Sequence, residues 1–140
     1  MTARRDRHGR GMRGPLAPPS IPISRTRAET FDDLVLDAFE HLETRWGAQL
    51  ENVQVIVEDV PPLSALERRP GSTIPLGTST PPRGSRPGQI VVYRRPIEAR
   101  ALDPEELHDL VHDVVVEQVA DLLGLDPQTV DPDYGWPEED

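Results

Sequence analysis

Two polar side chains, Gln118 and Asp121, occur on a helix face whose other residues are apolar. Residues 103–126 read DPEELHDLVHDVVVEQVADLLGLD, a pattern that is typical of one long amphipathic helix. At about 100° per residue, Gln118 falls near the middle of the apolar arc, and Asp121 falls between Leu110 and Val114. A buried amide or carboxylate costs free energy unless it is hydrogen-bonded. We therefore expect both side chains to be held against partners and to mark the functional part of the chain.

Two carboxylates on this helix have the spacing of a metal site. Glu117 and Asp121 are four residues apart and so share a helix face. Without histidine they would make a weak, oxygen-rich site for Mg²⁺, Ca²⁺ or Mn²⁺ rather than for tetrahedral zinc, with Asp126 as a further candidate ligand. The alternative is that both lie at the edge of the apolar face, hydrogen-bonded or solvated in a shallow cleft. For Gln118 the alternative is a core amide bonded to backbone at a strand edge.

A pair of histidines forms the second metal candidate. His108 and His112 are also four residues apart, in the sequence HDLVH, and this spacing can bind a metal. The position three beyond His112 is Val115, which offers no third ligand. Two histidines on a helix flank are more often residues at the boundary of the core, and this is the alternative interpretation. His41 and His8 have no companions in the sequence that indicate chemistry.

Composition and charge limit the classes of function. The chain has no cysteine, which excludes disulfides, cysteine-ligated zinc and a thiol nucleophile, and which fits a reducing cytoplasm. No run approaches the roughly 18 apolar residues of a membrane-spanning helix, and no apolar stretch follows the N-terminal arginines as in a secretory signal. The net charge is +6 over residues 1–27, −3 over 28–100 and −13 over 101–140. An acidic body argues against a nucleic-acid-binding core, although the Arg-rich tail could bind a polyanion.

The periodic segments are separated by loops that are rich in Pro and Gly. The predicted elements are, in chain order, a helix at 28–46 that stops at Gly47, a strand at 53–58, a loop at 63–88 with a candidate third strand at 73–76, a strand at 89–94, a connection at 95–100, the long helix, and a short turn at 126–130. At the start of the long helix, Asp103 as N-cap, Pro104 at the first position and Glu106 two further on resemble a capping box. Gly124 ends this helix. We expect a disordered Arg/Gly/Pro-rich tail at 1–27, one domain at 28–130 and an acidic tail at 131–140.

Taken together, these segments resemble a known family. An acid-rich first helix, the strand end VIVEDVPP, the strand and turn VVYRRPIE and a terminal helix ending in LLGLD occur in the order found in the minimal zincin-like family of small bacterial metallopeptidase-like domains. The resemblance spans about residues 31–136, and the start RRDRHGRGMRGPLAPP is similar to an actinobacterial branch. It implies an α+β fold, in which a small mixed sheet packs against two main helices.

The family motif is changed at its chemical positions. In the family the terminal helix carries H-E-x-x-H-x-x-G-x-x-D, where two histidines bind zinc and the glutamate is the general base for zinc-bound water. The resemblance places Glu117 and Asp121 at the two histidine positions. It places Gln118, which cannot take a proton at neutral pH, at the general-base position. The glycine is kept as Gly124, while the third-ligand position is Pro127.

Asp126 lies next to this third-ligand position, but the zinc ligands expected for the family are absent. We assign no catalytic residue and expect no cofactor. The function we favour is a pseudoenzyme of the metallopeptidase family, acting in the cytoplasm as a binding or scaffold module for an unknown protein or peptide partner. One alternative is a hydrolase or peptidase that uses a non-zinc divalent metal on carboxylates. The other is an interaction protein that acts through its basic N-terminal and acidic C-terminal tails.

Overall fold

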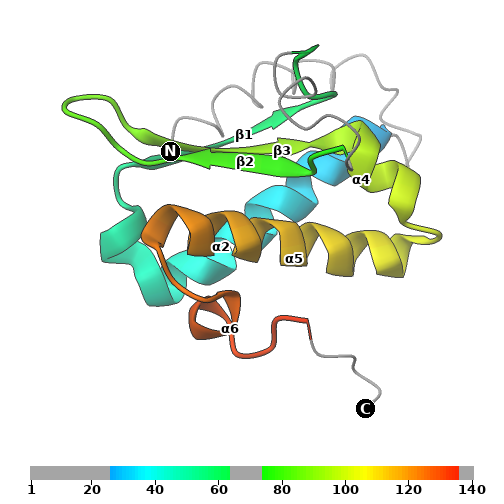
Figure 1. Ribbon diagram of the computed structural model, residues 1–140. Coiled ribbons are helices and arrows are strands. Elements are labelled where there is room, and N and C mark those ends of the chain that lie inside the picture. Colours follow the sequence, from blue (N-terminus) through cyan, green and yellow to red (C-terminus); the bar gives the residue numbers. More distant parts are fainter. Residues whose placement is uncertain (1–25, 64–73, 136–140) are drawn as a thin grey trace, which may run out of the picture.

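The computed structural model describes residues 26–63 and 74–135. A three-stranded sheet lies over two long helices, and a short C-terminal helix lies on the far side of these helices from the sheet (Figure 1). The predicted fold class, α+β with a small mixed sheet and two main helices, is confirmed. The predicted N-terminal tail falls outside the described residues, except for Thr26 and Arg27. None of the described helices is both long and apolar enough to cross a membrane.

The first long helix, α2 (Arg27–Leu50), extends further than its sequence pattern predicted. It starts with a capping box: the Thr26 hydroxyl accepts from the Glu29 N–H at 3.0 Å, and the Glu29 carboxylate accepts from the Thr26 N–H at 3.1 Å. The predicted stop at Gly47 is wrong, because this glycine does not adopt the left-handed conformation that ends a helix. The helix is distorted at Trp46 and continues for one more turn. This turn buries Leu50, which is 1% exposed.

The sheet contains β1 (Val53–Glu58), β2 (Gly77–Thr80) and β3 (Gly88–Tyr93) in the order β1-β3-β2. β1 is parallel to β3, and β2 is antiparallel to β3. The prediction of β1 is confirmed, and β3 begins and ends one residue earlier than predicted. The third strand was predicted too early, at 73–76. Pro75 lies in that segment and has no N–H for a strand ladder, so pairing with β3 begins at Gly77 instead.

Two short helices, one before and one after the second long helix, also belong to the described fold. The segment predicted as a connection to the long helix forms α4 (Arg94–Arg100), where the Arg94 guanidinium pairs with Asp59 at 3.1 Å and with Glu98 at 3.0 Å. After the second long helix, the predicted short turn at 126–130 forms α6 (Pro127–Val130).

The second long helix, α5 (Pro104–Leu123), begins and ends where the sequence predicted. The Asp103 carboxylate caps the helix by accepting from the Glu106 N–H at 2.8 Å. Glu106 does not close the box on Asp103 itself, because its carboxylate accepts from the Leu102 N–H at 2.8 Å. Gly124 ends the helix with a φ of 71°, a conformation that favours glycine.

The core lies between the sheet and the two long helices. Its buried members come from α2, the inner face of β1 and β3, α4, one side of α5 and α6; among the largest fully buried side chains are Phe31, Phe39, Leu50, Ile90, Val92, Ile97, Val111, Val115 and Val119. The valines of α5 bury the helix side that was predicted to be apolar. This packing fixes the rotation of α5, so that Glu117, Gln118 and Asp121 lie at the margins of the core rather than in it.

Candidate functional site

The segment of α5 that carries the motif positions lies between two other parts of the chain. On one side it contacts β2, the edge strand of the sheet, and on the other it contacts α6 and the residues that follow it (Figure 1). Each of the three motif side chains therefore meets a neighbour from one of these two elements.

Asp121 faces the edge strand. Its carboxylate accepts a hydrogen bond from the Ser79 hydroxyl at 2.7 Å. The residue is exposed, so it lies outside the buried apolar arc, at the edge of the apolar face and hydrogen-bonded, as the alternative interpretation predicted. β2 is only four residues long and is the last strand on this side of the described sheet, and the Asp121 side chain beside it is exposed.

Gln118 lies against the same strand, one turn earlier. The side chain is half-buried. A Cβ atom added to Gly77 would come within 3.2 Å of Gln118 Cγ and 3.3 Å of its Nε2, so the amide packs directly over this glycine. The bond to strand-edge backbone that the sequence led us to consider is not among the hydrogen bonds of the described residues.

Glu117 faces the opposite way, towards the C-terminal segment, which we define as residues 126–135. Its carboxylate accepts a hydrogen bond from the Tyr134 hydroxyl. This bond, together with burial and the negative charges of Glu117 and Asp113, raises the pKa of Tyr134 well above its ordinary value. The neutral hydroxyl therefore remains the donor at physiological pH. The sequence pattern gave no signal for this pairing, because Tyr134 falls in what reads as an acidic tail.

Three more contacts hold the C-terminal segment on the helices. His112 Nε2 and Asp131 Oδ2 are 2.7 Å apart, Trp46 donates its indole N–H to the Val130 carbonyl at 3.0 Å, and the Gly135 N–H donates to Asp113. Although the sequence analysis placed Asp131 in the acidic tail, the residue is only 5% exposed. Residues 131–135 thus pack on α5.

Two carboxyl groups of this region have pKa values shifted in opposite directions: that of Asp131 is lowered and that of Asp113 is raised. Burial acts to raise the pKa of Asp131, but hydrogen bonds from the Asp133 N–H and His112 outweigh it, and the pKa is lowered. For Asp113, burial and the nearby Glu117 raise the pKa more than His112 and the Gly135 N–H lower it. The partners of Asp131 thus favour its ionised form, while the surroundings of Asp113 favour its neutral form relative to a solvated carboxyl.

The histidines have a tertiary arrangement that their spacing did not reveal. The rings of His41 and His112 are 5.8 Å apart between centroids, a neighbour for His41 that the sequence did not reveal. The contact joins α2 to α5, and a sequence pattern within one helix cannot show it. Together with Asp37 and His108, the two histidines line a shallow cavity of about 290 Å³. His108 itself is largely exposed and lies 3.4 Å from Asp109.

Zinc, which the resemblance implies, does not fit the side chains at the motif positions. The donor set is two carboxylates and an amide, whereas zinc in proteins favours histidine and cysteine in a tetrahedral arrangement. Glu117 and Asp121 each already accept a hydrogen bond, one from Tyr134 and the other from Ser79. In the described parts of the chain, no three His, Asp or Glu side chains come together in a way that could hold a metal ion. Asp126, the further candidate, is exposed at the start of α6.

The chain is nevertheless related to metallopeptidases over most of the described structure. The family model described as zincin-like metallopeptidase matches residues 50–136, which is more than half of the chain and includes the sheet, α5 and the C-terminal segment. No curated protein matches the chain. The extent of the family match shows that the chain belongs to the zincin-like metallopeptidase family.

Proposed function

We propose that this member of the zincin-like family is catalytically inactive and serves as a binding module. The proposal rests on what the residues at the two histidine positions of the family motif contact in this fold. Glu117 and Asp121 accept hydrogen bonds from hydroxyl groups of two different segments, Tyr134 beyond α6 and Ser79 in the edge strand. Both carboxylates thereby join neighbouring segments to α5.

The general-base position supports the same conclusion. A peptidase of this type needs a group that removes a proton from the attacking water. The Gln118 amide has no proton-accepting function near neutral pH, and its side chain packs over Gly77. A residue in such a position contributes to the contact between α5 and the sheet edge.

We also propose where the domain begins and ends, and that the protein acts in the cytoplasm. The sequence predicted a domain at 28–130, and we propose that it also includes Thr26, which caps α2, and residues 131–135, which pack on α5. The cysteine-free composition fits the reducing conditions of the cytoplasm.

An assay of peptide hydrolysis tests the absence of catalysis. The full chain is incubated with a mixture of quenched-fluorescent peptides in Zn²⁺, Mn²⁺, Mg²⁺ or Ca²⁺, in parallel with Asp121→Asn and with Glu105→Gln as a control at an exposed position of the same helix. We expect no turnover above that of buffer in any metal. Metal-dependent turnover that Asp121→Asn abolishes and Glu105→Gln retains would overturn the proposal in favour of a carboxylate-bound metal hydrolase.

A further inference from the structure

A short hairpin between β2 and β3 carries two arginines directly opposite each other. The Arg83 N–H donates to the Arg86 carbonyl at 3.0 Å, and the Arg86 N–H donates to the Arg83 carbonyl at 2.9 Å. Gly84 and Ser85 form the turn between them, and Gly84 has the positive φ of 58° that such a turn requires at its first position. The backbone bonds hold the two arginines in a fixed relation on an exposed hairpin.

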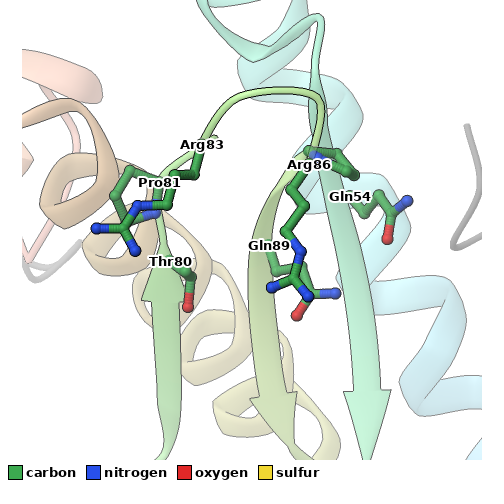
Figure 2. A pocket seen from close by; sticks show the side chains of 7 residues that line it. Gln54, Thr80, Pro81, Arg83, Arg86 and Gln89 are labelled. Atoms are coloured by element: carbon green, nitrogen blue, oxygen red, sulfur yellow. The ribbon is translucent and has the colours of Figure 1, made fainter.

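These arginines line a cavity with a volume of about 620 Å³. It lies on the outer face of the sheet, and the two long helices are behind the sheet in Figure 2. The strand register places Gln54 of β1 and Thr80 of β2 on either side of Gln89 in β3. The Arg86 side chain runs along β3 towards Gln89, and Arg83 extends beside β2 (Figure 2). The cavity is therefore lined by two guanidinium groups and by a row of neutral side chains that can form hydrogen bonds.

No described carboxylate lines this cavity, although the whole chain has a net charge of −10. Within the part of the chain that the structure describes, neither Arg83 nor Arg86 forms an ion pair. By contrast, Arg94, at the other end of β3, is paired with Asp59 and Glu98. The two hairpin guanidinium groups thus keep their bidentate donors available for an external anion.

We propose that this cavity binds an extended acidic segment of a partner protein. Guanidinium groups recognise carboxylates through two parallel hydrogen bonds, and the Gln54 and Gln89 amides offer a donor and an acceptor each to peptide backbone. Three neighbouring strands span about 10 Å, which matches roughly three residues of extended peptide and exceeds a single small anion. The negative charge of the remaining body disfavours a nucleic acid, whose binding depends on neutralising many phosphates.

Binding of an acidic segment at this cavity is a separate proposal from the loss of catalysis and does not depend on it. The cavity and the motif positions of α5 lie on opposite faces of the sheet. Asp121→Asn, which tests the motif, is therefore expected to leave acidic-peptide binding unchanged.

The test is an NMR titration of the ¹⁵N-labelled full chain with unlabelled hexaglutamate at low salt. We expect chemical-shift changes at the backbone amides of Gln54, Arg86 and Gln89 that saturate as hexaglutamate is added. Binding at these amides should be about fivefold or more weaker in Arg83→Gln/Arg86→Gln, because two charged contacts are lost. Observing individual amides separates this site from any binding by the N-terminal arginines.

The matched control is Arg95→Gln/Arg100→Gln, which removes the same charge from exposed positions on α4 and should leave the titration unchanged. A further variant, Arg83→Lys/Arg86→Lys, keeps the charge but loses the bidentate geometry, and should bind with intermediate strength. Equal weakening by both glutamine pairs would overturn the proposal, as would shifts confined to other residues. Tighter binding at these amides by hexathymidylate than by hexaglutamate would also overturn it and indicate a nucleic-acid site.

Discussion

Removal of the Tyr134 hydroxyl is expected to weaken the packing of the C-terminal segment on α5. In Tyr134→Phe the ring remains packed against the core and only the hydrogen bond to Glu117 is lost. A hydrogen bond to a charged group contributes about 1.5–3 kcal/mol. Both side chains are half-buried, so screening by solvent reduces this, and we expect a loss of about 1–2 kcal/mol in the free energy of unfolding.

Denaturant melts followed by circular dichroism measure this loss. For a folded body of about 100 residues, 1 kcal/mol also lowers the melting temperature by roughly 4–8 °C. A double-mutant cycle with Glu117→Ala isolates the pair, and we expect a coupling energy of about 1 kcal/mol. Asp126→Ala, at an exposed carboxylate of the same segment, is the control and should show no coupling with Tyr134→Phe.

The pH dependence gives the sign of the effect. The folded-state pKa of Tyr134 is raised above its ordinary value of 10.0, so the unfolded chain releases this proton first as the pH increases. The contribution of the hydroxyl is therefore complete below about pH 10 and is lost as the pH rises further. A loss below about 0.3 kcal/mol at pH 7, or a cycle with no coupling, would refute the reasoning that Glu117 acts as a structural acceptor.

Four further substitutions test other parts of the structure. Gly77→Ala should lower the free energy of unfolding by about 1–3 kcal/mol in a denaturant melt, because the added Cβ would lie 2.8 Å from the Val91 carbonyl oxygen. Gly47→Ala should instead raise the free energy of unfolding by about 0.5–1 kcal/mol in the same melt, because a Cβ added there would have no atom within 4 Å. Asp131→Asn should destabilise the fold at pH 7. Because the folded-state pKa of Asp131 is lowered, the difference from the wild type should begin to shrink as the pH falls below the ordinary carboxyl pKa of 3.8, and it is lost as the pH falls through the folded-state pKa; a difference that stays constant from pH 7 to pH 2 would contradict this. Gln118→Glu should produce no peptide turnover in any metal, because the histidine ligands are still missing, and turnover by this variant would be evidence against our account.

Periodicity and capping residues were sufficient to predict much of the fold. The alternating valines of β1 and the start and end of α5 at Asp103 and Gly124 were found because each depends on local sequence alone. The strand β2 was misplaced, since it has no alternating apolar pattern and depends on pairing with β3. The Gly84-Ser85 dipeptide was an available signal for a two-residue hairpin turn and would have placed β2 correctly.

The candidate site was less accessible to sequence reasoning, because its contacts are tertiary. The resemblance to the family located the motif positions on α5, but helix spacing alone could not show what each side chain meets. Tyr134 and Asp131 belong to a segment rich in acids and prolines, and their burial results from docking on α5. The ring contact between His41 and His112 joins two helices that are distant in the sequence.

The central claim is that Glu117 and Asp121 act as hydrogen-bond acceptors in the fold and do not hold a metal. The most direct test is the metal content of the tag-free full chain after equilibrium dialysis against Zn²⁺ or Mn²⁺, measured beside Glu117→Ala/Asp121→Ala and His108→Ala. Our account predicts that no metal is retained in a way that depends on Glu117 and Asp121. One tightly held metal ion per chain that is lost in the Glu117→Ala/Asp121→Ala variant, and kept in His108→Ala, would contradict it.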